Sequence, residues 1–176
     1  MTSRIGPILV VLLFNLALQA KEPLGPAVSE SAALRRSLLK SESLAVFEGL
    51  PHPQWQPQVF AEEAERDDTV TIQKFKFYKP DVKVQEPQSL GELLASSKTI
   101  GRWSGPKLCG GFHPDFAVQW TTQQGRKLSA LICFGCYEIK FVDGDQVFHY
   151  DLREAKTLKA ALAAYKKKRP PQPQFF

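Results

Sequence analysis

Four short segments in the second half of the chain alternate apolar and polar residues with a period of two. This period is typical of half-buried β-strands, whose successive side chains point to opposite faces of a sheet. Turn signals separate the segments, and the strongest is Asp143-Gly144, because glycine tolerates the positive φ that a tight hairpin requires. The pattern predicts a four-stranded antiparallel meander with strands at 116–120, 128–133, 137–141 and 147–150.

A further alternating segment runs from Thr69 to Tyr78. Its apolar positions shift by one residue between Ile72 and Phe75. A shift of this kind is expected where one extra residue is inserted into a strand. The segment therefore predicts one more strand with a bulge, which gives a sheet of four to five strands.

Three segments carry helical signals. Residues 29–39 place leucines on one side after Ser29, and Ser89 with Glu92 forms a capping box before another leucine-rich stretch. From Asp151 to Tyr165 apolar residues recur at spacings of three and four, which is typical of a helix with one apolar face. Together with the strands, they predict an α+β fold in two layers, with the helices packed on one face of the antiparallel sheet.

The region between the first helix and residue 69 follows no regular period. Prolines at 51, 53 and 57 exclude both a helix and a central strand there. We expect this irregular segment to place Phe47, Leu50 and Trp55 against the core. Residues 61–68 are mainly acidic and predict a solvated turn or short helix.

The first twenty residues have the form of a secretory signal peptide. A basic start is followed by an apolar stretch over 8–18 and a small residue, Ala20. A spanning helix needs about 20 apolar residues, so no transmembrane helix is predicted. The expected organisation is a signal peptide at 1–20, a leader with a short helix at 21–44, a single domain at 45–169 and a proline-rich tail at 170–176. We expect a secreted or periplasmic protein.

Composition and charge add one feature to this picture. The chain has 176 residues, 43% of them hydrophobic, and a formal net charge of +5. Arg4 lies in the expected signal peptide, and Lys166, Lys167, Lys168 and Arg169 hold the other four excess charges, so no nucleic-acid surface is indicated. This basic stretch could dock on an anionic envelope surface, although we favour the simpler interpretation of a helix end followed by a frayed terminus.

The three cysteines of the chain lie in two motifs that carry the candidate chemistry. Cys109 and His113 belong to one segment, and Cys133 and Cys136 flank Phe134-Gly135 at an expected turn. If the strands after His113 and before Cys133 pair, their ends bring all four residues together. Three cysteines and one histidine could then hold zinc, which takes four such ligands tetrahedrally. Asp115 would orient His113.

Two alternatives remain open for the same cysteines. In an exported protein, Cys133 and Cys136 could form a short-range disulfide with Cys109 as a partner thiol. The residues after Cys136 alternate like a strand, so the helix that lowers a thioredoxin-like thiol pKa is missing. The cysteines could also be plain buried apolar residues.

Catalysis has less support than binding. Cys109 with His113 could act as nucleophile and base, but no third orienting group is recognisable. His52 lies between prolines and His149 near the end of a strand, so we expect a loop residue and a solvent-facing one. The sequence therefore predicts a binding or interaction domain with a zinc site. The alternatives are a thiol–disulfide protein of the envelope and a scaffold with a basic tail.

Three motifs together resemble a group of small exported bacterial proteins of unknown function. They are Gly49-Leu50-Pro51-His52-Pro53, the segment from Cys109 to Asp115, and Cys133-Phe134-Gly135-Cys136. The resemblance covers roughly residues 45–168 and implies a bacterial envelope setting. It implies no activity, ligand or partner.

Overall fold

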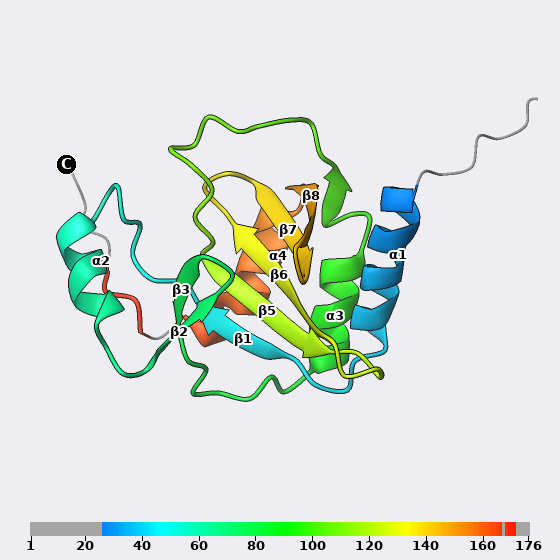
Figure 1. Ribbon diagram of the computed structural model, residues 1–176, viewed down its shortest axis with the longest axis horizontal. Helices are drawn as coiled ribbons and strands as arrows, with labels where there is room; N and C mark the ends of the chain where they lie inside the picture. The colour runs from blue at the N-terminus through cyan, green and yellow to red at the C-terminus, as the bar shows by residue number, and fades with distance from the viewer. Residues whose placement is uncertain (1–25, 167, 172–176) are drawn as a thin grey trace, which may run out of the picture.

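The centre of the fold is a six-stranded antiparallel sheet in the order β1-β5-β6-β7-β8-β4 (Figure 1). The computed structural model describes residues 26–166 and 168–171. The expected signal peptide lies outside the described residues. The strands are β1 Ala45–Glu48, β4 Ile100–Arg102, β5 Phe116–Thr121, β6 Lys127–Cys133, β7 Glu138–Asp143 and β8 Gln146–Leu152.

The predicted meander is confirmed as β5 to β8. Phe116 pairs with Ile132, Ile132 with Ile139, and Val142 with Val147. Gly144 has a φ of 58° in the turn between β7 and β8, which is the conformation that glycine adopts without steric cost. β1 and β4 extend the meander at its two edges.

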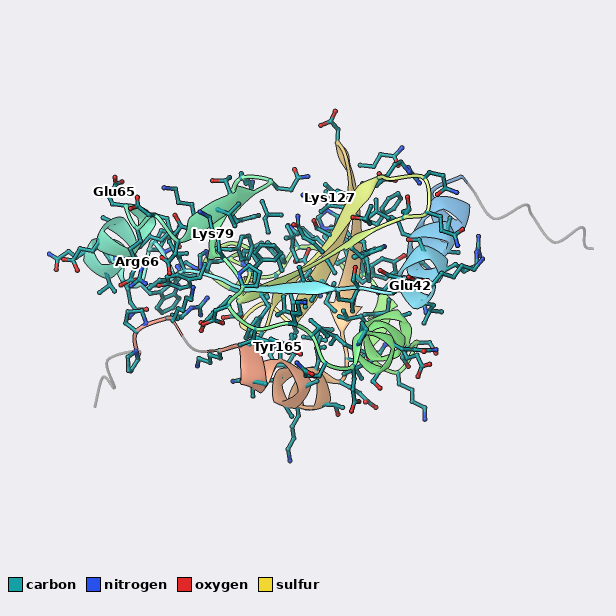
Figure 2. All side chains as sticks on the ribbon, turned by 90° about the horizontal axis from the view of Figure 1, so that it is seen from below. Glu42, Glu65, Arg66, Lys79, Lys127 and Tyr165 are labelled. Carbon is teal, nitrogen blue, oxygen red and sulfur yellow. A yellow bond between two sulfur atoms is a disulfide. The ribbon has the colours of Figure 1, made fainter. Side chains whose placement is uncertain are left out.

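Three helices cover one face of this sheet: α1 Pro26–Leu39, α3 Pro87–Ala95 and α4 Ala155–Leu162. α4 ends in a short 3-10 turn, η1 Ala163–Tyr165. Alternate residues of the strands, such as Val118 and Phe141, point to these helices and form the larger core with Leu94 and Leu158. The predicted α+β fold with an antiparallel sheet is confirmed (Figure 2).

α1 packs into this core, although the sequence placed its residues in a leader. Leu34 and Leu38 are buried, and Trp120 Nε1 donates a hydrogen bond to Ser37 Oγ at 2.9 Å. A Cβ atom added to Gly91 of α3 would lie 3.3 Å from the Leu38 carbonyl oxygen. The close approach of these two helices makes α1 part of the packed domain.

The expected bulged strand at 69–78 is instead a hairpin. β2 Thr69–Ile72 and β3 Phe75–Tyr78 form a separate two-stranded sheet. The one-residue shift in the apolar pattern marks the turn at Gln73 and Lys74, where Gln73 has a φ of 57°. The hairpin buries Ile72 and Phe77 against Leu131 on the opposite face from the three helices.

Two helix starts also differ from the prediction. α3 begins at Pro87 and α4 at Ala155, rather than after Ser89 and Asp151. Asp151 is unavailable as a cap because β8 runs through it to Leu152, and its carboxylate accepts from Lys107 Nζ at 2.8 Å. Residues 61–64 of the acidic segment form the end of α2 Pro57–Ala64, and residues 65–68 lie outside any helix or strand. Within the described part of the chain, none of the helices could cross a membrane.

Candidate ligand cleft at the disulfide

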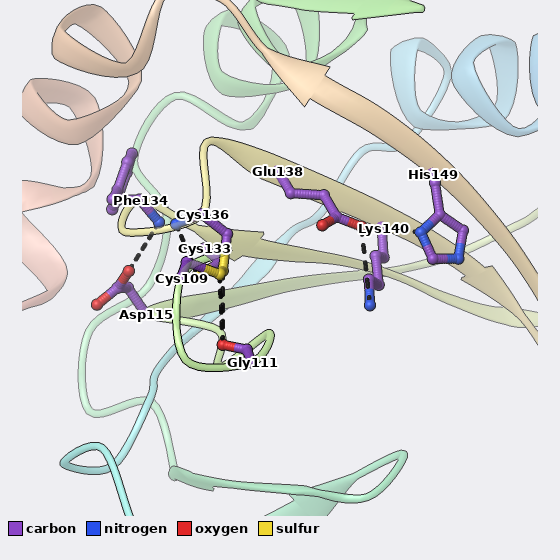
Figure 3. Close-up of a disulfide and its surroundings, with 9 residues drawn as sticks. All are labelled: Cys109, Gly111, Asp115, Cys133, Phe134, Cys136, Glu138, Lys140 and His149. Carbon is purple, nitrogen blue, oxygen red and sulfur yellow. Dashed lines mark hydrogen bonds and ion pairs between the residues drawn. A yellow bond between two sulfur atoms is a disulfide. The ribbon is translucent and has the colours of Figure 1, made fainter. Parts of the chain in front are cut away.

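The register of β5 and β6 brings the two cysteine motifs together. Asp115 N donates to the Ile132 carbonyl at 2.7 Å, just before the pairing of Phe116 with Ile132. The chain before Asp115 therefore runs beside the turn that follows Cys133. Cys109 and Cys136 meet there in a disulfide with a Cα–Cα distance of 5.3 Å (Figure 3).

Cys133 is the remaining thiol of the group. It is buried, and Cys136 N donates to its sulfur at 3.3 Å. Burial raises the thiol pKa of Cys133, although contacts with backbone N–H groups partly oppose the shift. Because the thiolate is the nucleophilic form, this position suits a structural cysteine.

The disulfide does not join the pair that the sequence suggested. The alternative was Cys133 with Cys136, whereas the structure bonds Cys136 to Cys109. Cys133 ends β6 with its side chain buried, while Cys136 in the turn lies beside the incoming segment of Cys109.

The four residues expected to bind zinc lie close together, but two of the cysteines are oxidised and cannot bind zinc as thiolates. Zinc binds cysteine as thiolate, and two of the three sulfurs are joined in the disulfide. His113 Nε2 lies 2.8 Å from the Leu50 carbonyl oxygen, which occupies one ring nitrogen. Among the described residues, no group of three or more His, Cys, Asp or Glu has a metal-binding arrangement. A zinc site would require the reduced protein and stays a prediction.

His113 forms a pair with His52, for which the sequence predicts a structural loop residue. Their ring centroids lie 4.7 Å apart, and His52 Nδ1 accepts a hydrogen bond from Gln54 N at 3.2 Å. Burial lowers the pKa of both imidazoles; for His52 the nearby His113 adds to the effect. Both rings are therefore held in the neutral form near neutral pH.

Asp115 has a different role from the predicted one of orienting His113. Its Oδ2 accepts a hydrogen bond from Phe134 N at 2.8 Å, and its Oδ1 pairs with Arg169 Nη1 at 2.9 Å. The first contact holds the turn after β6, as Figure 3 shows. Asp115 thus connects this turn to the C-terminal segment.

Arg169 belongs to the site, although the sequence indicated it only as part of the basic stretch. Its side chain is 9% exposed, and its Nε donates to the Gly49 carbonyl at 2.7 Å. A Cβ atom on Gly49 would lie 2.1 Å from the Pro114 carbonyl oxygen. Gly49 therefore lets β1, the segment of Pro114 and Arg169 approach one another closely.

The basic stretch is only partly available to an external partner. Lys168 Nζ pairs with Asp68 at 3.0 Å, and the Lys168 and Arg169 backbone N–H groups donate to Glu48. Hydrogen bonds from Arg66 and Lys168 lower the pKa of Asp68. Arg169 forms an ion pair with the Asp115 carboxylate. Lys166 is exposed, and Lys167 lies outside the described residues. The proposed anionic surface partner stays a prediction.

Two hollows lie beside the loop segment that the disulfide holds, with volumes of about 440 and 420 Å³. We call them together the cleft. The first is lined by the disulfide, Trp55, Leu108 and Arg169, and the second by Phe60, Lys74, Phe75 and Phe112. Both are lined by His52, Gly110, Gly111 and His113, which form their common wall.

Trp55 takes part in the cleft instead of the core. We expected it to be buried, but it is 65% exposed. A Cβ atom on Gly110 would lie 3.4 Å from two atoms of its indole ring. Gly110 and Gly111 have φ values of 78° and 100°, which favour glycine. The two glycines therefore permit the left-handed backbone of this loop, which runs at van der Waals distance from the indole at Gly110.

A second polar cluster lies on the outer part of β7 and β8. His149 Nδ1 lies 2.8 Å from Glu138 Oε1, and the His149 ring packs on Trp103 with centroids 4.9 Å apart. We expected His149 to face solvent, but it is partly covered by these contacts. None of the hollows described above includes it.

None of the protein-family models, curated proteins or solved structures compared with this chain matches it. The resemblance to small exported bacterial proteins therefore stays a prediction. Any functional inference for this chain has to come from the cleft itself.

Proposed function

We propose that this protein is an exported binding domain whose ligand site is the cleft beside the Cys109–Cys136 disulfide. One observation carries the proposal: the disulfide holds the Gly110–His113 segment as a wall shared by two hollows. A concave site formed by apolar side chains with a few polar groups is the usual form of a small-molecule site.

The disulfide supports binding because it fixes the wall in advance. Residues 103–115 connect β4 to β5 as a loop without helix or strand, and the disulfide fixes this loop at Cys109. Holding such a loop in its bound shape reduces the entropy lost when a ligand binds. Two further contacts fix the position of this segment. They are the hydrogen bond between the His113 ring and the Leu50 carbonyl, and the ion pair of Asp115 with Arg169.

The chemistry of the lining favours binding over catalysis. The Cys133 thiol has a raised pKa, and the Asp115 carboxylate is paired with Arg169. The two imidazoles are neutral near pH 7 because burial lowers their pKa. These groups can donate and accept hydrogen bonds to a ligand, but no activated nucleophile is among them.

The test is a fragment screen followed by ¹⁵N–¹H NMR on the oxidised protein, using anionic, cationic and neutral fragments. We expect the shifted amides to cluster at Gly110, Gly111, His113 and Gln54. In a Cys109→Ser/Cys136→Ser variant these shifts should weaken at least several-fold, while Cys133→Ala, which retains the disulfide, should weaken them far less. Shifts scattered over the surface, or clustered at the polar hollow beside Arg36 and Gln123, would contradict the proposal.

Export is the second part of the proposal. It is supported by the signal-like residues 1–20 and by the disulfide, since disulfides persist in oxidising compartments. Expression of the full chain in a bacterium, followed by N-terminal sequencing of the periplasmic fraction, tests it. A processed chain that begins near Lys21 is expected. An unprocessed protein retained in the cytoplasm would exclude export.

A further inference from the structure

We propose that the hollow beside the β2–β3 hairpin takes a ligand with an apolar body and one carboxylate group. This inference rests on the proposed function and names the ligand class of the same cleft. The hollow has a volume of about 420 Å³, enough for a ligand of one or two aromatic rings.

Three aromatic side chains supply the apolar part of this hollow. Phe60 comes from α2, Phe75 from β3, and Phe112 from the disulfide-held loop. Phe75 and Phe112 lie edge to face with ring centroids 5.8 Å apart. Elements far apart in the sequence therefore present rings to one space, and such rings favour offset or edge contacts with another ring.

The charged part of the lining has one sign. The titratable side chains that line this hollow are His52, Lys74, Lys76 and His113, and no Asp or Glu lines it. Lys76 is already engaged, because its Nζ donates to the Ala64 carbonyl at 2.7 Å. A cationic ligand would therefore meet no counter-charge here, whereas an anion would meet at least one.

Lys74 is the lysine of this lining that remains available. It lies in the turn between β2 and β3, its side chain is exposed, and its Nζ is 5.6 Å from the Phe75 ring centroid. Within residues 26–166 and 168–171, Lys74 has no ion-pair partner. A ligand carboxylate placed beside the Phe75 ring could form an ion pair with the Lys74 ammonium group.

The backbone of the loop adds a donor at Phe112, a residue that lines the hollow. The Gly111 carbonyl oxygen lies 3.5 Å from Cys136 Sγ and 3.6 Å from Cys109 Sγ. In a trans peptide the next N–H points the opposite way, so the Phe112 N–H points away from the disulfide. No carbonyl of the described residues accepts from it, which leaves it free to bind an acceptor oxygen.

One charge fits this site better than two. A phosphate group carries close to two negative charges, whereas Lys74 is the one lysine of this lining whose ammonium group has no hydrogen-bond or ion-pair partner among the described residues. A carboxylate carries one charge, which matches this single available cation.

The test compares naphthalene-2-carboxylate with its neutral isostere naphthalene-2-carboxamide, titrated into the oxidised protein and followed by ¹⁵N–¹H NMR. We expect the carboxylate to bind more tightly than the amide, with shifts at Lys74, Phe75 and Phe112. Lys74→Gln should weaken carboxylate binding by about threefold to tenfold and leave the amide unchanged. Lys98→Gln, at another exposed lysine of the chain, is the matched control and should change neither.

The outcomes separate the two proposals. If carboxylate and amide bind equally at the cleft, or Lys74→Gln has no more effect than Lys98→Gln, the carboxylate inference is wrong while the binding cleft stands. If cationic or other fragments bind at the cleft and neither naphthalene compound does, the ligand class is again wrong. If no compound of any charge shifts the amide signals of the cleft residues, both proposals fail.

Discussion

At the scale of single residues, the cleft depends on groups whose local surroundings change their chemistry. Burial is the main cause of the lowered pKa of His113 and His52. The pairing of Asp115 with Arg169 fixes a carboxylate that would otherwise repel an anionic ligand. None of these partners is close in sequence, which is why the residue types alone did not reveal their roles.

The two buried histidines predict how stability changes with pH. Their pKa values in the folded protein lie below the ordinary value of 6.5, so the unfolded chain takes up protons more readily. Their contribution to stability is therefore fully present above pH 6.5 and is lost as the pH falls towards the lowered values. Urea unfolding between pH 7.5 and 5, above the range of most carboxylates, should show a falling free energy of unfolding.

A variant isolates the histidine contribution. His113→Gln keeps a side-chain donor for the Leu50 carbonyl but cannot be protonated. Its free energy of unfolding should change less between pH 7.5 and 5 than that of the unmodified protein. An equal slope in both proteins would show that His113 is not held neutral by burial.

Gly49 gives a steric prediction at the same scale. In Gly49→Ala the new Cβ would lie 2.1 Å from the Pro114 carbonyl oxygen, so the backbone has to move. We expect the free energy of unfolding to fall by about 2 kcal/mol or more. Gly135→Ala is the control, because a Cβ there meets no atom within 4 Å; similar losses in both variants would contradict the close packing at Gly49.

At the scale of elements, the sequence pattern predicted the parts that depend on local alternation. The meander of β5 to β8 was predictable because each strand has its own period and each turn its own signal. The β2–β3 hairpin was mistaken for a bulged strand, because a two-residue turn and a bulge both shift the period around Gln73. The pairing of β4 with β8 was not predictable, because β4 has only three residues and is too short to show an alternating pattern.

The loop held by the disulfide gives the prediction at this scale. Cys109 and Cys136 are separated by 27 residues, and closing a loop of this length restricts the unfolded chain by roughly 3–4 kcal/mol. Cys109→Ser/Cys136→Ser should therefore lower the free energy of unfolding by up to that amount, measured by urea unfolding. Cys133→Ala should cost only about 1 kcal/mol; a larger loss in Cys133→Ala than in the double variant would contradict the assigned bond.

At the scale of the whole molecule, the C-terminal segment connects parts of the fold that lie far apart in the sequence. Arg169 reaches Gly49 beside β1 and Asp115 before β5, and Lys168 reaches Asp68 near the β2–β3 hairpin. These contacts span more than 50 residues of sequence in each case. A run of basic residues after a helix gives no sign of such partners, so the sequence suggested an external anionic surface.

Arg169→Ala measures how much the contacts of the C-terminal segment contribute to the free energy of unfolding. It would leave the Asp115 Oδ1 and the Gly49 carbonyl without their donor, and the free energy of unfolding should fall by about 2 kcal/mol. Lys166→Gln changes an exposed charge in the same segment and should have little effect. If both variants were equally stable, the contacts of Arg169 would not contribute to the stability of the fold.

The convergence of the cysteine motifs was predictable only as far as strand pairing was assumed. The sequence placed Cys109 and His113 before one strand and Cys133 at the end of another. The register, which no single residue encodes, decides that Cys109 meets Cys136 and leaves Cys133 as the buried thiol. The choice between a metal and a disulfide depended on that register.

Cysteine mapping tests the account most directly. The exported protein is alkylated under denaturing, non-reducing conditions, digested and analysed by mass spectrometry, with its native mass measured beforehand. We predict a mass about two units below that of the reduced chain, a peptide pair joined through Cys109 and Cys136, and alkylation at Cys133 alone. Three alkylated cysteines with one zinc lost on denaturation, or a bond between Cys133 and Cys136, would contradict a cleft closed by the Cys109–Cys136 disulfide.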